Sequence, residues 1–322
     1  MVQVASKMVY NSNNKLRVFE AFAGYGSQSL ALERLKRDYP EFDFEVVGIS
    51  EIDKYAIQAY DALHPNVTNY GDISKIDWSQ VPDFDLFTYS SPCQDFSNAG
   101  LQKGGEEGSG TRSSLLWECR RAIVAKRPKY LLLENVKALT SKKFMPLFGK
   151  WLKSLEDYGY YTNWQVLNTK NYGIPQNRER VFAFSIRRDL LDPNPIYHFP
   201  KPFVLKLRLK DMLEAKVDEK YYLSDKIVKG FMEHNQRHEE KGTGFQFKPK
   251  DGGGYATCIR ANAASAPTDN FIIEDKVIQV GNLSPYTPRF KNRTFGRVYN
   301  AEGIAPTINT CLGGQSDNDS SV

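Results

Sequence analysis

The alternation of short apolar runs with helix-like stretches between residues 16 and 186 constrains the fold more than any other feature of this sequence. The predicted strands are residues 16–22, 44–50, 84–90, 130–136, 161–169 and 180–186, and the predicted helices are residues 29–39, 54–64, 112–126 and 144–158. Such alternation with short connections is typical of an open, mostly parallel α/β sheet covered by helices on both faces. Ligands bind these sheets beyond the carboxyl ends of the strands, so functional residues are expected at those positions.

The stretch DPNPIYHFPKPF (192–203) contains four prolines and marks a change in composition. Beyond it, glycine, asparagine, threonine and proline are frequent, and helical periodicity is weak. We therefore predict two domains, an α/β domain over residues 1–199 and a smaller, irregular, β-rich domain over residues 200–322.

The composition argues against several classes of protein. The 322 residues are 41% hydrophobic and 25% charged, with a net charge of only +5, which is ordinary for a globular chain. The cysteines are far apart and form no CxxC motif, which argues against a disulfide framework or a zinc site; they are Cys93, Cys119, Cys258 and Cys311. We expect neither a signal peptide nor a membrane span. His234 and His238 have metal-like spacing, but their charged surroundings favour a solvated helix and we expect no metal.

Three motifs in order indicate a nucleoside cofactor. The glycines of FAGYG (22–26), between a strand and a helix, would let the backbone approach a ligand. Glu51 ends the second strand, where dinucleotide-binding folds carry a ribose-binding carboxylate, and Asp72 follows in a later loop. Each acid alone is better explained as a solvated loop charge. FAGYG lacks the third glycine of the dinucleotide fingerprint, so pyrophosphate binding is not indicated.

Cys93 lies in SPCQDFS (91–97), directly after a predicted strand, where a proline fixes the exit of the chain. A nucleophilic cysteine must be reachable as thiolate, so a loop suits it. Glu134, in ENV (134–136), also ends a strand and could act as a general acid. Arg178 and Arg180 in QNRER (176–180) come at the start of a predicted strand and could add positive charge to the site. The alternative is a surface ion pair with Glu179. Cys119, Cys258 and Cys311 are interpreted as structural.

Taken together, FAGYG, SEID (50–53), GDI (71–73), SPCQDFS, ENV and QNRER resemble, in order and spacing, the cytosine carbon-5 DNA methyltransferases of restriction–modification or phage type. The resemblance extends from Leu16 to about Ile186 and implies a fold of the S-adenosylmethionine-dependent methyltransferase type. Residues 1–199 would then be the catalytic domain and residues 200–322 the target-recognition domain.

The resemblance also implies roles for single residues. S-adenosylmethionine would be bound by Phe22, Gly24, Gly26, Glu51, Ile52, Asp72, Ile73 and Pro92. Cys93 would attack carbon 6 of cytosine, Glu134 would protonate ring nitrogen 3, and Arg178 would contact the cytosine oxygen, while Asn135 and Arg180 would hold the site in shape. The target base must be rotated out of the duplex before the cysteine can reach it. The glycine-rich stretch 100–112 is predicted to be a lid over that base.

The stretch YTPRFKNRTFGR (286–297) interleaves aromatic and basic side chains in the predicted target-recognition domain. We predict that Arg289, Lys291, Arg293 and Arg297 contact double-stranded DNA, although a basic hairpin on a solvated surface is the alternative. The expected location is the cytoplasm of a bacterial or phage-infected cell.

The sequence departs from the family pattern in two places. Ile52 replaces the aromatic residue that stacks on adenine in many relatives. The "PxExxRLxGFP"-like and "QxGNS" segments that normally follow the variable region are not found, so we expect a fragment, a truncated product or a subunit completed by a second polypeptide.

Three other functions are compatible with the sequence. A tRNA cytosine carbon-5 methyltransferase would share the motifs, although the long basic recognition region favours DNA. A catalytically incomplete DNA-binding subunit is the second. The third is a thiol hydrolase using Cys93, which would need a histidine partner; His64, His198, His234 and His238 lie in no such motif.

Overall fold

A computed structural model describes residues 10–92, 112–191, 197–214, 217–242, 246–259, 270–273, 278–282, 297–300 and 308–309. The chain divides into two compact units. The first unit consists of Met1–Leu167 and Glu179–Lys201, and the second of Asn168–Arg178 and Pro202–Val322. The functional division at residue 199 stays a prediction.

The first unit is built on a six-stranded sheet in the order β2-β1-β3-β4-β6-β5. The strands are β1 (Leu16–Ala21), β2 (Phe44–Ser50), β3 (Leu86–Tyr89), β4 (Tyr130–Val136), β5 (Tyr160–Asn168) and β6 (Glu179–Arg187). Strands β2, β1, β3 and β4 are parallel, which confirms the predicted mostly parallel α/β sheet. Strand β6 runs antiparallel to β4, a reversal that the sequence patterns did not predict.

Four α-helices connect these strands: α1 (Ser27–Asp38), α2 (Lys54–Leu63), α3 (Cys119–Lys126) and α4 (Met145–Asp157). Short 3₁₀ helices span Ile73–Lys75, Arg112–Glu118, Lys137–Thr140, Thr169–Tyr172, Arg188–Leu190, Leu209–Met212 and Glu219–Tyr221. The predicted helix 112–126 is therefore only partly α-helical. Its apolar residues recur three and four positions apart, a spacing that suits both helix types, so periodicity could not separate them.

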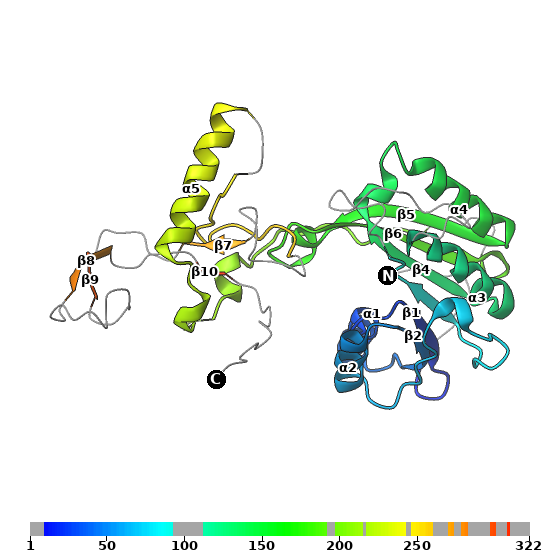
Figure 1. Ribbon diagram of the computed structural model, residues 1–322. Coiled ribbons are helices and arrows are strands. Elements are labelled where there is room, and N and C mark those ends of the chain that lie inside the picture. The colour runs from blue at the N-terminus through cyan, green and yellow to red at the C-terminus, as the bar shows by residue number, and fades with distance from the viewer. Residues whose placement is uncertain are drawn as a thin grey trace, which may run out of the picture. The chain divides into compact units, whose positions relative to one another are not determined.

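Helices cover both faces of the sheet (Figure 1). Phe19 on β1 belongs to the core cluster that also contains residues of α3 and α4, whereas Val18 belongs to a cluster with Leu32 of α1. Successive residues of a strand point to opposite faces, so these two clusters lie on opposite sides of the sheet. Each fully buried Phe or Leu side chain in them stabilises the fold by about 1.5–3 kcal/mol.

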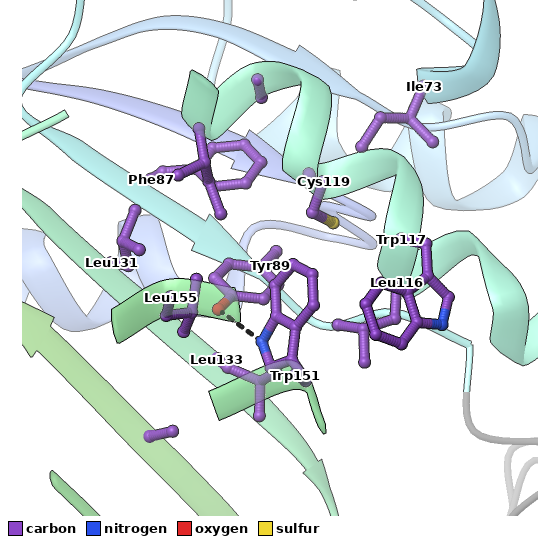
Figure 2. Close-up of a cluster of buried hydrophobic side chains, with 14 of the residues drawn as sticks. Ile73, Phe87, Tyr89, Leu116, Trp117, Cys119, Leu131, Leu133, Trp151 and Leu155 are labelled. Atoms are coloured by element: carbon purple, nitrogen blue, oxygen red, sulfur yellow. Dashed lines mark hydrogen bonds between the residues drawn. The ribbon is translucent and has the colours of Figure 1, made fainter. Parts of the chain in front are cut away.

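The core under α3 and α4 is rich in aromatic side chains (Figure 2). Trp151 of α4 is fully buried, and its Nε1 donates a hydrogen bond of 3.3 Å to the hydroxyl of Tyr89 at the end of β3. Trp117 meets Trp151 edge-on, with ring centroids 5.5 Å apart. Cys119 is 0% exposed among these rings, and burial raises the pKa of its thiol, which agrees with its predicted structural role.

The second unit contains helix α5 (Asp225–Glu240) and the strands β7 (Phe271–Ile272), β8 (Ile278–Asn282), β9 (Arg297–Asn300) and β10 (Ile308–Asn309). Strands β8 and β9 form one antiparallel pair, and β7 and β10 another. A small core forms around Leu209, Ala256 and Ile272. A β-rich recognition domain stays a prediction, because α5 is the longest element among the described residues.

His234 and His238 both lie on α5, with ring centroids 4.2 Å apart. Within the described ranges, no group of three or more His, Cys, Asp or Glu side chains is arranged to hold a metal ion. In the same ranges, no helix has the length and apolar character that a bilayer crossing requires.

Candidate active site

Parallel strands end at the same edge of a sheet, so the residues that follow β1, β2, β3 and β4 are brought together at one edge of the first unit. Several predicted site residues fall into two groups there, and each group includes one residue that was not predicted, Asn69 or Ser91. We call Gly24, Glu51, Asn69 and Asp72 the cofactor corner, and Ser91, Glu134, Asn135 and Arg180 the base corner.

The loop after β1 has an unusual backbone. Phe22, Gly24 and Gly26 have φ values of 57°, 59° and 83°, all in the left-handed region. At Gly26 an added Cβ would lie 2.5 Å from Nε2 of His64, so only glycine fits. At Gly24 an added Cβ would meet no atom within 4 Å, so this part of the backbone is open to a ligand.

Glu51 ties the end of β2 to this loop. Its Oε2 accepts a hydrogen bond of 2.8 Å from the backbone N–H of Gly24, and its Oε1 accepts bonds of 2.8 Å from both Ile52 N–H and Asp53 N–H. An ionised carboxylate has about four acceptor positions, so it can still accept a bond from a ligand hydroxyl. Ile52 beside it is 72% exposed.

Asp72 begins the short 3₁₀ helix Ile73–Lys75 and caps it. Its Oδ1 accepts bonds of 3.0 Å from Ser74 N–H and 2.8 Å from Ser74 Oγ, and these bonds lower the pKa of the Asp72 carboxyl below its ordinary value. The side chain is still 35% exposed, so the ionised carboxylate is available to a ligand. Ile73 is 2% exposed and packs in the core, which anchors this turn.

In the base corner, Asn135 joins the end of β4 to the segment after β3. Its Nδ2 donates to the backbone oxygen of Ser91 at 3.1 Å and to Ser91 Oγ at 3.3 Å. Both residues are buried, at 2% and 4% exposure, so these bonds have little competition from water. Pro92 follows Ser91, whereas Cys93 lies outside the described residues, as do residues 100–111 of the predicted lid.

Glu134 forms an ion pair with Arg180, with Arg180 Nε 3.1 Å from Glu134 Oε1. The antiparallel register pairs Val136 with Arg180, so the start of β6 lies beside the end of β4. Glu179 is held by Lys137, whose Nζ lies 2.9 Å from its carboxylate. The alternative in which Arg180 pairs with the Glu179 side chain is therefore wrong.

Arg178 belongs to the second unit. There its Nη1 donates to Cys258 Sγ at 3.4 Å, and the neighbouring Asn177 N–H donates to Ala256 O at 2.6 Å. Among the predicted DNA contacts, Arg297 begins β9, although its side chain is outside the described set. Arg289, Lys291 and Arg293 lie outside the described residues altogether.

The sequence patterns missed two residues with hydrogen-bonding roles in the first unit. Asn69 binds Glu51 directly. Glu20 of β1 is 0% exposed and accepts hydrogen bonds from Ser29 N–H at 2.9 Å and from Tyr60 OH at 2.7 Å. Burial raises the pKa of the Glu20 carboxyl. An acid inside an otherwise apolar strand was the available signal, because buried carboxyls are rare unless they have partners.

The chain is similar to known methyltransferases. The model of the family described as C-5 cytosine-specific DNA methylase matches residues 16–308. Over 266 residues the chain is 42% identical to the Type II methyltransferase M2.ScrFI of Lactococcus lactis subsp. cremoris. The aligned region covers 66% of this chain and 71% of that protein. It is 31% identical over 352 residues to the orphan methyltransferase M.Rho11sI of Bacillus phage rho11s, covering 92% of this chain and 67% of that protein.

The orphan methyltransferase M.SPRI of Bacillus phage SPR is 34% identical, over 93% of this chain but only 65% of its own length. Among solved structures, the Entamoeba histolytica methyltransferase EhMeth has a TM-score of 0.63 at 16% identity, over 89% of this chain and 83% of that one. A Spodoptera frugiperda DNMT2 mutant has a TM-score of 0.61 at 18% identity, over 81% and 75%. At such identities the likeness concerns the fold alone.

Proposed function

The chain belongs to the C-5 cytosine-specific DNA methylase family, and from this membership we propose how its own residues methylate carbon 5 of cytosine in double-stranded DNA. S-adenosylmethionine supplies, when bound, a sulfonium-linked methyl group that carbon 5 of the activated cytosine accepts. Relatives from Lactococcus and from Bacillus phages support a role in the cytoplasm of a bacterial or phage-infected cell.

The residues of the cofactor corner fit this cofactor. Glu51 has spare acceptor capacity for the ribose hydroxyls, and the partly exposed Asp72 carboxylate suits the adenine amino group. The exposed side chain of Ile52 offers an apolar surface to the adenine ring. The open space beside Gly24 leaves room for the cofactor at the backbone. Phe22, Gly26, Ile73 and Pro92 would complete the pocket.

The chemistry would begin with the Cys93 thiolate, which forms a bond to carbon 6 of a flipped-out cytosine. Glu134 hydrogen-bonds and protonates ring nitrogen 3, so the electron pair released into the ring makes carbon 5 nucleophilic. After methylation, loss of the carbon-5 proton to solvent restores the double bond and expels the Cys93 thiolate, and ring nitrogen 3 returns its proton to Glu134. Arg178 would hold the cytosine oxygen, while Arg180 would orient Glu134.

The observation that carries this mechanism is the pair of hydrogen bonds from Asn135 to Ser91. Asn135 follows Glu134 directly, and Ser91 precedes Cys93 by two residues. The proposed acid and the proposed nucleophile are thus attached to two segments that a buried side-chain amide holds together. This supports their action on one base.

The test is transfer of tritium from methyl-labelled S-adenosylmethionine to duplex DNA, with tRNA as a parallel substrate. We expect label on carbon 5 of cytosine in DNA. Label in tRNA alone would replace this proposal with a tRNA methyltransferase. DNA binding without any transfer, by a chain that binds S-adenosylhomocysteine, would favour a catalytically incomplete DNA-binding protein.

We also propose that Arg289, Lys291, Arg293 and Arg297 bind phosphates of the target DNA. Each phosphate contact releases condensed counterions, so affinity falls as salt rises. Neutralising one of these residues to Gln should reduce the slope of log affinity against log salt by about 1. An unchanged slope in all four variants would favour the alternative of a solvated basic hairpin.

A further inference from the structure

Residues 68–71 lie alongside β2 as a short parallel edge. Ile49 N–H donates to Thr68 O at 2.9 Å, and Tyr70 N–H donates to Ile49 O at 2.8 Å. Asn69 lies between these two bonds and pairs with Ile49. The edge therefore brings Asn69 next to Glu51, the first residue after β2.

The side-chain amide of Asn69 binds both segments that carry the acids of the cofactor corner. Its Oδ1 accepts from Glu51 N–H at 3.1 Å and from Gly71 N–H at 2.9 Å, and its Nδ2 donates to Glu51 O at 3.0 Å. Glu51 is thus held at both its N–H and its carbonyl group. Gly71 immediately precedes Asp72, so the same side chain also fixes the start of the Asp72 turn.

The neighbouring residue Tyr70 prevents this edge from sliding. Its ring packs so closely on Gly48 that an added Cβ there would lie 2.5 Å from Tyr70 Cε2. The ring centroid lies 5.9 Å from that of Phe19 in the core. Asn69 is consequently presented to Glu51 from an anchored backbone.

We propose that Asn69 is a positioning residue that sets the spacing of Glu51 and Asp72 for the nucleoside part of the cofactor, an inference that rests on the proposed function. The two acids would bind the ribose and the adenine of one rigid ligand. Both must be correctly placed at the same time, and a hydrogen-bonding side chain that contacts both segments meets that need. Asn69 touches no part of the ligand in this role.

The first experiment measures the affinity for S-adenosylhomocysteine by calorimetry in Asn69→Ala. We expect it to be about tenfold weaker, the equivalent of one lost hydrogen bond. The matched control is Asn163→Ala. Asn163 lies on β5, the edge strand farthest from β2, and the variant loses a hydrogen bond of 3.0 Å from Asn163 Nδ2 to Tyr197 O. The control should lower the melting temperature without changing the affinity.

A double-mutant cycle separates positioning from general stability. If Asn69 acts through Asp72, the affinity losses of Asn69→Ala and Asp72→Ala will not add in the double variant. Additive affinity losses would show that Asn69 does not act through Asp72 and would overturn the proposal.

Asn69→Gln covers the case in which the alanine variant fails to fold, because it keeps both hydrogen-bonding groups and adds one methylene. We expect it to fold and to bind several-fold more weakly. If the unaltered chain binds but both folded Asn69 variants bind equally well, this inference alone is wrong. If the unaltered chain does not bind S-adenosylhomocysteine, the proposed function fails and the inference fails with it.

Discussion

The cofactor corner and the base corner hold their carboxylates in different ways. Glu51 is bound by three backbone N–H groups, two of them from the next two residues. Glu134 is bound by the side chain of Arg180, which lies on the antiparallel strand β6, 46 residues later in the chain. Backbone donors fix a carboxylate in one position, whereas a guanidinium can exchange partners. The first arrangement suits a ligand that is bound in one pose. The second suits a carboxyl group that must interact with the target cytosine during the reaction.

The largest effect should come from the base corner. Duplex DNA with 5-fluorocytosine at the target position cannot lose its carbon-5 substituent after methyl transfer, so the chain should remain covalently attached. Cys93→Ser should abolish the complex on a denaturing gel while leaving the affinity for S-adenosylhomocysteine unchanged. Cys311→Ser is the control and should retain the complex. A complex that persists in Cys93→Ser would show that Cys93 is not the nucleophile.

Glu134→Gln should slow methyl transfer by roughly 100- to 10,000-fold, because an amide can donate a hydrogen bond to ring nitrogen 3 but cannot protonate it. Single-turnover kinetics at saturating cofactor and DNA would measure this. Glu179→Gln is the matched control, since that carboxylate lies on β6 and pairs with Lys137. Equal rates in the two variants would contradict the role proposed for Glu134.

Asp72→Ala should weaken binding of S-adenosylhomocysteine by about 1–3 kcal/mol, or roughly 5- to 150-fold, with little change in rate at saturating cofactor. Asp77→Ala is an unusually close control. Asp77 accepts hydrogen bonds from Ser79 N–H at 3.0 Å and from Ser79 Oγ at 2.7 Å. Asp77→Ala therefore removes the same two kinds of hydrogen bond as Asp72→Ala. If the two variants bind alike, Asp72 acts on its own turn and has no contact with the ligand.

The smallest expected effect concerns Glu20, a buried carboxyl on β1. Burial raises the pKa of this acid in the folded state. The contribution of Glu20 to the free energy of unfolding is therefore complete below the ordinary pKa of the carboxyl group and is lost as pH rises through the folded-state pKa. Glu20→Gln should therefore lessen the fall in stability as pH rises above the ordinary carboxyl pKa of about 4.3. Urea midpoints would measure it, with the exposed Glu33→Gln as control. Parallel pH profiles for the unaltered chain and Glu20→Gln would exclude this role.

Most of the cofactor corner could be predicted from the sequence because local patterns determine it. The apolar run 44–50 becomes β2 with the same bounds, so Glu51 was correctly placed directly after that strand. The run 130–136 likewise becomes β4, and Glu134 of the base corner is among its last three residues. Asn69 could not be predicted. Its contacts depend on the packing of Tyr70 against Gly48, and a polar loop residue carries no sign of such packing.

The base corner was harder to predict because it depends on strand direction. The run 180–186 was recognised as a strand, yet an apolar run does not specify whether it pairs parallel or antiparallel. In the structure β6 is antiparallel, and this direction puts Arg180 opposite Val136 at the end of β4. In a parallel β6, Arg180 would have lain beside the amino-terminal end of β4 and far from Glu134. The Glu134–Arg180 pair is thus a product of topology.

The buried thiol of Cys119 can serve as a chemical probe of how often the core of the first unit opens. Thiol reagents attack accessible thiolates, and this sulfur is enclosed by the core beneath α3 and α4, with burial raising its pKa (Figure 2). Alkylation at Cys119 therefore requires that core to open. Peptide mass spectrometry can follow this one site separately from the other cysteines, and its labelling rate would report how often the core opens and whether a bound ligand slows that opening.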